Sequence, residues 1–364
     1  MKILLIAGAR PNFMKISPIY RESLKYQDVD CKLVHTGQHY DYEMSQAFFE
    51  DLEIPKPDYF LGSGSGSHAV QTARIMIAFE EVCKQEKPDL VVVVGDVNST
   101  LACSIVAKKL LISVAHVEAG LRSFDLTMPE EINRIVTDSI SDLFFVTEQS
   151  GVENLLREGK PIERIHFVGN VMIDNLLYHL DKLEREDGKR FPSSKVKKEK
   201  KRYVFLTLHR PSNVDFKETL EEITHGLIEI AKETPILFPV HPRTQSRLDQ
   251  FDIRLPEEIV LLPPLGFRES LFLWKDAILV MTDSGGLQEE TTALGIPCIT
   301  LRENTERPVT IELGTNTLAG NSKDKILGAY KAALEKKRKN LTIPPQWDGK
   351  TSQRIWDIIV NGMK

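Results

Sequence analysis

Short apolar runs alternate with amphipathic stretches of helical period along the chain. Leu90–Val94 is apolar at every position, which is typical of a parallel strand covered by helices on both faces. Alternating strands and helices predict a doubly wound α/β sheet. In the first half the pattern predicts strands at Ile3–Ala7, Lys32–His35, Leu90–Val94, Val114–Val117, Leu143–Val146 and Ile165–Val168, and helices at Val70–Lys84, Ser99–Lys109, Pro129–Ile140 and Gln149–Glu158.

The second half repeats this pattern after a predicted helix at Met172–Leu183. The stretch 189–202 has eight basic residues and one acid, and we interpret it as a solvated connector rather than a polyanion site. We expect two doubly wound domains, 1–170 and 171–349, with a ligand cleft between them. The amphipathic segment Ser352–Val360 predicts a helix within 350–364 that packs back on the first domain. The second set of predicted strands is Tyr203–Leu208, Ile236–Val240, Ile259–Leu262, Ile278–Thr282 and Cys298–Thr300.

Composition narrows the possible functions. The chain has 364 residues, 27% of them charged, and a net charge of -5, which argues against a general nucleic-acid binder. Its four cysteines have neither zinc nor disulfide spacing, so no metal is expected. No apolar run approaches the roughly 20 residues of a membrane span, so we expect a cytoplasmic protein without a membrane partner.

The first strand ends in a turn that brings two cations close to a helix start. Arg10 and Lys15 follow Gly8, and cations at this place suit a diphosphate or another dianion. Surface cations on an ordinary helix are the alternative interpretation. A GxGxxG fingerprint is absent here, which makes an NAD-dependent dehydrogenase a minor option.

Three carboxylates are expected at neighbouring positions of the first sheet. Asp96 and Glu118 follow two strands, and Glu130 opens a helix. Helix capping could explain Asp96, and the helix dipole could explain Glu130, but Glu118 has no local capping duty. Carboxylates that face one cleft raise one another's affinity for protons, which suits general acids and bases.

The second half offers a histidine and an anion cradle. His209 follows a strand, and Ser284-Gly285-Gly286 connects another strand to a helix whose N–H groups could approach phosphate. Glu290 is better placed to accept hydrogen bonds from ribose hydroxyls, and Arg307 adds a cation. A nucleoside diphosphate explains all these groups, whereas helix capping explains only Ser284 and Gly285.

Together these segments resemble the non-hydrolysing UDP-N-acetylglucosamine 2-epimerase family over essentially the whole chain. The matching blocks are GARPNFMK at 8–15, GQH at 37–39, GD at 95–96, HVEAGLR at 116–122, PEEINR at 129–134, LHRPSN at 208–213, HPRT at 241–244, TDSGGLQEE at 282–290 and TERP at 305–308.

The resemblance implies a glycosyltransferase-B-like fold of two Rossmann-like domains, usually as a homodimer. Members interconvert UDP-GlcNAc and UDP-ManNAc without cofactor or metal, through loss of the C2 proton and of UDP, and return of both. It implies catalytic positions at Asp96, Glu118, Glu130 and His209. It implies contacts to UDP, pyrophosphate or sugar by Arg10, Lys15, Arg134, Ser284, Gly285, Gly286, Glu290 and Arg307.

Some positions depart from the family pattern. Tyr40 and Ser212 stand where members activated by a second UDP-GlcNAc tend to have arginine and glutamate, and Val309 replaces a common glutamate, which could accompany a modified sugar. The alternatives are an epimerase of a related UDP-2-acetamido sugar, a hydrolysing epimerase, a glycosyltransferase of the same fold, and a nucleotide-sugar sensor.

Overall fold

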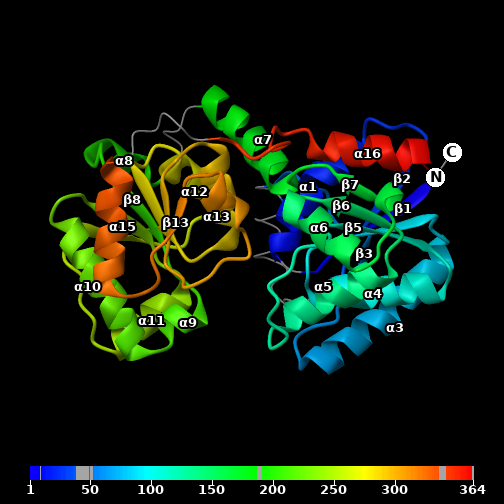
Figure 1. Ribbon diagram of the computed structural model, residues 1–364, viewed down its shortest axis with the longest axis horizontal. Coiled ribbons are helices and arrows are strands. Elements are labelled where there is room, and N and C mark those ends of the chain that lie inside the picture. Colours follow the sequence, from blue (N-terminus) through cyan, green and yellow to red (C-terminus); the bar gives the residue numbers. More distant parts are fainter. Residues whose placement is uncertain (9, 38–48, 50–51, 187–190, 336–341, 363–364) are drawn as a thin grey trace. The chain divides into compact units, whose positions relative to one another are not determined.

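The computed structural model describes residues 1–8, 10–37, 49, 52–186, 191–335 and 342–362. The chain divides into two compact units. Unit 1 comprises Met1–Asn175 and Pro345–Lys364, and unit 2 comprises Leu176–Pro344. Each unit has its own parallel sheet, with helices on both faces (Figure 1).

Unit 1 contains a seven-stranded sheet with the order β3-β2-β1-β4-β5-β6-β7. The strands are β1 (Lys2–Ala7), β2 (Asp30–His35), β3 (Tyr59–Phe60), β4 (Leu90–Val94), β5 (Ser113–Val117), β6 (Leu143–Val146) and β7 (Ile165–Phe167). The helical segments are α1 (Arg10–Ser23), α3 (His68–Glu86), α4 (Asn98–Lys109), α5 (Pro129–Ile140), α6 (Gln149–Arg157), η1 (Ile162–Arg164) and α7 (Val171–Arg185), which continues into unit 2, and α16 (Thr351–Gly362).

Both faces of this sheet are buried, as the apolar strands require. Every residue of β4 is buried, and Phe79 of α3 packs into the core on one face. On the other face α16 packs against α1, where Trp356 Nε1 donates to Ile19 O at 2.8 Å (Figure 1). Buried Asp174 accepts the N–H groups of Thr351 and Ser352, which fixes the start of α16.

Unit 2 repeats the design with a six-stranded sheet of order β10-β9-β8-β11-β12-β13. Its strands are β8 (Val204–Thr207), β9 (Ile236–Pro239), β10 (Ile259–Leu262), β11 (Leu279–Thr282), β12 (Cys298–Thr300) and β13 (Asn316–Leu318). Its helices are α8 (Ser194–Glu199), α9 (Pro211–Val214), α10 (Lys217–Ala231), α11 (Pro242–Gln250), α12 (Phe267–Trp274), α13 (Gly285–Ala293), α14 (Val309–Glu312) and α15 (Lys323–Glu335).

The predicted α/β fold of two Rossmann-like halves is confirmed, with three local corrections. The strands β3 and β13 were not predicted because they have only two and three residues, and β13 is largely polar. The helix α8 (Ser194–Glu199) was likewise not predicted, and it lies within the stretch 189–202 that we interpreted as a connector. Lysine and glutamate are good helix formers even without an apolar stripe.

The strand order of each unit reverses at one place in the sheet, which is its topological switch point. The order reverses between β1 and β4 in unit 1, and between β8 and β11 in unit 2. In open parallel sheets the crevice beyond the carboxyl ends at such a point is the usual ligand position. The residues that follow these four strands are therefore the first to be considered as site residues.

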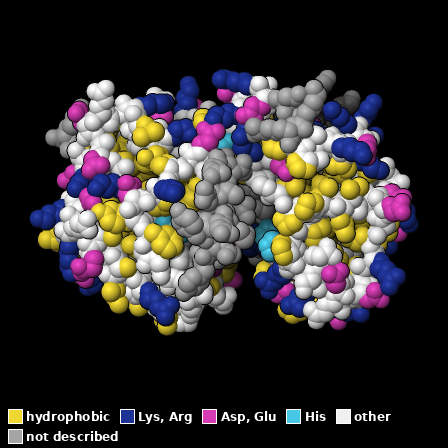
Figure 2. All heavy atoms as spheres, turned by 180° about the vertical axis from the view of Figure 1, so that it is seen from behind, with side chains coloured by type: hydrophobic (Ala, Val, Ile, Leu, Met, Phe, Trp, Pro, Cys, Tyr) yellow, Lys and Arg dark blue, Asp and Glu magenta, His cyan; other side chains and the backbone are white. Residues whose placement is uncertain are grey.

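The surface offers no single dominant charge in the view of Figure 2. Basic and acidic side chains are scattered over the visible face, in keeping with the small net charge of the chain. Among the helices that the structure describes, none is long and apolar enough to cross a membrane.

Candidate functional site

Asp96 follows β4 at the switch point of unit 1 and is held by a cation. Its Oδ2 lies 2.7 Å from Nη1 of Arg134, and its side chain remains 33% exposed. The residue at the N-cap of α4 is Val97, without a side-chain capping bond. Capping therefore does not explain Asp96, and the carboxylate is left accessible at the end of the strand.

Glu118 follows β5 with a strained backbone. Its φ is +70°, a region that side chains other than glycine rarely adopt. The carbonyl of Phe145 accepts the N–H groups of both Glu118 and Ala119, at 3.0 and 3.2 Å. The buried carboxylate of Glu118 lies 2.5 Å from Lys15 Nζ. Strained backbone that the surroundings enforce is a feature of functional positions.

Gly95 shows how closely these groups converge. Its φ is +70°, and a Cβ added there would lie 3.2 Å from Lys15 Nζ and 3.6 Å from Glu118 Oε2. The turn after β4, the helix after β1 and the end of β5 therefore meet at one place. Glycine allows this close approach because it has no side chain.

Helix α5 contributes two of the predicted residues. Glu130 is half-buried in its first turn, and its carboxylate makes no hydrogen bond or ion pair within the described part of the chain. One turn later Arg134 reaches Asp96 and also Glu131, whose Oε2 lies 3.0 Å from Arg134 Nε. Glu131 is buried, and its carboxylate accepts the backbone N–H groups of Ser123 and Phe124. Glu131 therefore fixes the preceding loop, while Glu130 is left available.

Unit 1 thus brings together Lys15, Asp96, Glu118 and Arg134, with Glu130 on the same helix as Arg134. Asp96 forms an ion pair with Arg134, and Glu118 forms one with Lys15. The sequence predicted carboxylates that affect one another, but it did not predict these ion pairs. Arg10 begins α1, but its side chain lies outside the described part of the structure, as do Gln38 and His39.

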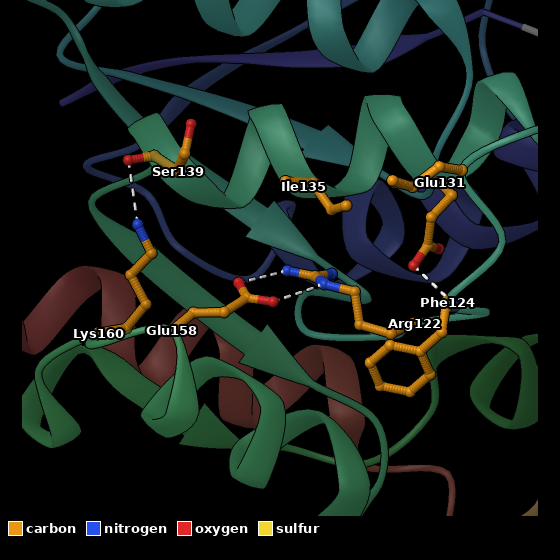
Figure 3. A pocket seen from close by; sticks show the side chains of 8 residues that line it. Arg122, Phe124, Glu131, Ile135, Ser139, Glu158 and Lys160 are labelled. Carbon is orange, nitrogen blue, oxygen red and sulfur yellow. Dashed lines mark hydrogen bonds and ion pairs between the residues drawn. The ribbon is translucent and has the colours of Figure 1, made fainter.

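A pocket of about 480 Å³ opens beside α5, and none of its lining residues is a predicted site residue (Figure 3). Two of its charged groups form an ion pair, in which Arg122 contacts both oxygens of Glu158 at 2.8 and 2.7 Å. Lys160 donates to the backbone carbonyl of Ser139. The pocket is lined by Arg122, Phe124, Leu126, Glu131, Ile135, Ser139, Glu158 and Lys160.

In unit 2 His209 lies beside Asp283 at the switch point between β8 and β11. His209 Nδ1 is 2.8 Å from Asp283 Oδ1, and the backbone N–H groups of His209 and Arg210 donate to Asp283 Oδ2 at 2.9 and 2.8 Å. Burial would raise the pKa of Asp283, but the His209 imidazole and these N–H groups outweigh burial and lower the pKa below its usual value.

The sequence interpretation missed Asp283. It lies within the block TDSGGLQEE, yet only the residues after it were chosen as site residues. The available signal was an aspartate directly at the carboxyl end of an apolar strand, next to glycines. Because Asp283 is fully buried and His209 is 42% exposed, Asp283 orients the histidine and His209 is the member that a ligand can reach.

The start of α13 has the features of an anion cradle. Ser284 occupies the N-cap, but its side chain makes no capping hydrogen bond, so helix capping does not account for its hydroxyl. A Cβ added to Gly285 would have nothing within 4 Å, which leaves the space beside this first residue of the helix open. Gly286 follows in the same first turn. Free N–H groups at a helix start favour phosphate.

Glu290 lies buried on the same helix. Burial, with a contribution from the neighbouring charge of Glu289, raises its pKa to about 8. Arg307 lies beside the neighbouring acid, with its Nε 2.6 Å from Glu289 Oε1. The loop that carries Arg307 is tied to α13 by Gln288, whose Oε1 accepts from Thr305 Oγ1 at 2.7 Å. The predicted residues His209, Ser284, Gly285, Gly286, Glu290 and Arg307 therefore belong to one region of unit 2.

No set of three or more His, Cys, Asp or Glu side chains suited to a metal ion occurs within the described ranges. The cysteines Cys31, Cys83, Cys103 and Cys298 are free thiols, and burial raises the pKa of Cys298 to about 12. These thiols are therefore poor candidates for nucleophiles.

Two Rossmann-like halves in one chain place the protein in the glycosyltransferase-B-like class of α/β folds. A family model described as UDP-N-acetylglucosamine 2-epimerase matches residues 22–360. The chain belongs to the UDP-N-acetylglucosamine 2-epimerase family, whose activity is an isomerisation.

Individual relatives agree with this assignment. A UDP-N-acetylglucosamine 2-epimerase of Methanocaldococcus jannaschii is 46% identical over 371 residues, which cover 100% of both chains. The crystal structure of M. jannaschii UDP-GlcNAc 2-epimerase in complex with UDP-GlcNAc and UDP aligns with a TM-score of 0.87 at 45% identity, covering 100% of both chains. A UDP-2,3-diacetamido-2,3-dideoxy-D-glucuronate 2-epimerase of Pseudomonas aeruginosa is 40% identical over 345 residues, covering 92% of this chain and 93% of the relative.

Proposed function

We propose that this protein interconverts UDP-GlcNAc and UDP-ManNAc by elimination and re-addition of UDP. The observation that carries the proposal is the placement of carboxylates and cations beyond the carboxyl ends of β1, β4 and β5 in unit 1. Family membership and the M. jannaschii relative support the same reaction.

In the first half-reaction a carboxylate of unit 1 takes the proton from C2 of the sugar. The electron pair of that C–H bond forms the C1–C2 double bond, the C1–O bond breaks, and its electrons leave with UDP. The product is 2-acetamidoglucal. In the second half-reaction a proton is delivered to the opposite face of C2, and an oxygen of UDP attacks C1. No oxidant is needed, because the electrons are balanced within the substrate.

The groups of unit 1 suit proton transfer on two faces of one carbon. Asp96 lies beside Arg134 and Glu118 beside Lys15, and a carboxylate is a group that can accept a proton from carbon. Glu130, without such a partner in the described part of the chain, is the third carboxylate that could supply a proton.

The groups of unit 2 suit the leaving group. We propose that the start of α13, with Ser284, Gly285, Gly286 and His209, holds the pyrophosphate. For unit 1 we propose substrate contacts by Arg10, Lys15 and Arg134. The C2 proton is poorly acidic, so a stabilised leaving group lowers the barrier more than a stronger base would. Glu290 would accept the ribose hydroxyls, and Arg307 supports this region through Glu289.

Incubation with UDP-GlcNAc in D2O, followed by proton NMR, tests the proposal. We expect UDP-ManNAc with deuterium at C2, without added nicotinamide cofactor. Product that keeps its C2 proton would contradict the proton-transfer mechanism, and release of free ManNAc would point to a hydrolysing epimerase.

A related UDP-2-acetamido sugar is a second candidate substrate. It is favoured by the 40% identity to the Pseudomonas aeruginosa relative, which acts on a diacetamido glucuronate, and by Val309 in place of glutamate. Comparing kcat/KM for UDP-GlcNAc and for UDP-2,3-diacetamido-2,3-dideoxy-D-glucuronate decides between them. We also propose a homodimer, an expectation that sedimentation equilibrium tests directly.

A further inference from the structure

We infer that the buried pair His116 and Asp138 is a positioning element that sets the places of Asp96 and Glu118. The inference rests on the proposed function, because it assigns to the pair a role in placing the acids of that reaction. Neither His116 nor Asp138 was predicted as a site residue, and both side chains are fully buried.

His116 ties the turn before Asp96 to the central sheet. It lies on β5 opposite Val93 of β4, and its Nε2 is 2.9 Å from Gly95 O. A backbone carbonyl only accepts, so Nε2 carries the proton and donates it. The residue that follows this carbonyl group is Asp96, so the imidazole fixes the backbone from which that carboxylate projects.

Asp138 ties two further segments to the same imidazole. Its Oδ1 lies 2.6 Å from His116 Nδ1, and its Oδ2 accepts the N–H of Gly120 at 3.0 Å. Gly120 is two residues after Glu118, whose strained φ of +70° needs a rigid continuation of the chain. Asp138 itself belongs to α5, the helix that carries Glu130 and Arg134.

The charges of the cluster are balanced within the protein. Asp138 Oδ2 is 2.8 Å from Arg122 Nη1. Arg122 also donates two hydrogen bonds to the carboxylate of Glu158 (Figure 3). Burial would raise the pKa of Asp138, but His116, Arg122 and the N–H of Gly120 outweigh it and leave the pKa below its usual value. Asp138 therefore stays an acceptor for three groups of the stretch 116–122 at once: His116 Nδ1, the N–H of Gly120 and Arg122 Nη1.

Stability alone does not require a buried cluster of charged side chains at this position. Buried ion pairs contribute little net stability compared with apolar side chains of similar volume, because desolvation offsets their attraction. What a charged, hydrogen-bonded cluster provides is a defined geometry. Here the segments that it joins are those next to the three proposed catalytic carboxylates.

The test compares His116→Gln and Asp138→Asn with Asp174→Asn in the full-length protein. Asp174 is a matched control because it is also a buried carboxylate of unit 1 that accepts two backbone N–H groups, but those groups start α16. We expect both site variants to lose about 10- to 100-fold in kcat, since small misplacement of reacting groups has effects of that size. Their affinity for UDP and the stoichiometry of binding should stay as in the wild type.

The control separates positioning from stability. Asp174→Asn should lower Tm by a similar amount and keep the wild-type kcat. His116→Gln, whose amide can still donate to Gly95 O, should retain more turnover than His116→Leu. Two outcomes would overturn the inference in a protein whose wild type is active. One is a decrease in kcat that follows the decrease in Tm in every variant, Asp174→Asn included. The other is an unchanged kcat in His116→Leu. Absence of C2 exchange in the wild type would instead remove the proposed function, and the inference with it.

Discussion

Asp283 contacts both the side chain and the main chain of His209: its Oδ1 lies beside the imidazole, and its Oδ2 accepts the backbone N–H. The distances are 2.8 Å to Nδ1 and 2.9 Å to the backbone nitrogen. This arrangement leaves Nε2 as the ring nitrogen that a ligand can meet.

Asp283→Asn should therefore impair His209 without removing it. An amide nitrogen opposite Nδ1 would donate instead of accept, and the ring would carry its proton on Nε2. We expect kcat to fall about 10- to 100-fold, the effect typical of partners that orient a working imidazole. Steady-state epimerisation of UDP-GlcNAc, measured for Asp283→Asn, His209→Asn and the double variant, gives the answer.

If the two residues act as a unit, the double variant is no slower than His209→Asn alone. Asp215→Asn is the matched control, because Asp215 is a carboxylate of unit 2 that pairs with Arg243 and Arg247 instead. Independent, multiplicative losses for Asp283 and His209 would contradict the orienting role.

Asp96→Asn and Glu118→Gln should abolish turnover and spare nucleotide binding. Each substitution removes a carboxylate that could accept the C2 proton, and general acid–base groups contribute about 100- to 10,000-fold to rate. UDP should still bind, because Ser284, Gly285 and His209 belong to unit 2. Rapid-quench turnover and calorimetric titration with UDP measure the two properties separately.

Asp142→Asn is the control for these two variants. Asp142 is also paired with a lysine, since its Oδ2 is 2.8 Å from Lys108 Nζ, but it precedes β6 and so lies at the amino end of the strands. It should keep its kcat. Equal loss of turnover and UDP affinity in Asp96→Asn would refute the proposed roles.

The fold could be predicted from the sequence because its strands are continuous apolar runs. Leu90–Val94 and Ile259–Leu262 were predicted with the bounds that the structure has. The polar Asn316–Leu318 was not, since its pairing with β12 comes from the sheet and not from its own composition.

The positions of site residues could likewise be predicted, but not their partners. The end of each apolar strand indicated Asp96, Glu118 and His209. Their partners depend on strand order and helix packing: Arg134 reaches Asp96 across 38 positions, and His209 meets Asp283 across 74. Such separations leave no periodic signal in the sequence.

Trp356→Ala should destabilise unit 1 and leave unit 2 unchanged. Trp356 is fully buried between α16 and α1, donates to Ile19 O and stacks on Tyr26 with ring centroids 5.7 Å apart. Deleting a buried tryptophan costs about 3–5 kcal/mol. Hydrogen exchange should show faster opening of β1 and α1, with β8 and β11 unaffected. Uniform loss of protection in both units would show that they unfold together.

The raised pKa of Glu290 predicts that ribose binding releases a proton. With a pKa of about 8 the carboxyl is protonated at neutral pH, whereas hydroxyl donors of a ribose require the ionised form. Between pH 6 and 8 the Kd of uridine should therefore fall, approaching tenfold per pH unit at the lower end. Uridine is the probe of choice because, unlike UDP, it has no phosphate that titrates in this range. Calorimetry in buffers of different ionisation enthalpy counts the released proton.

Stability should change in the opposite direction. The pKa of Glu290 in the folded protein lies above its ordinary value of 4.5. Between pH 4.5 and about 8 the folded unit therefore keeps a proton on Glu290 that the unfolded chain has released. The free energy of unfolding of unit 2 therefore falls as pH rises from about 4.5 toward 8. Glu290→Gln should bind uridine weakly, without this pH dependence. Glu289→Gln removes the charge that helps to raise the pKa, so its binding curve should shift to lower pH. A wild-type Kd for uridine that is constant from pH 6 to 8 would rule out a Glu290 carboxyl that loses a proton when ribose binds.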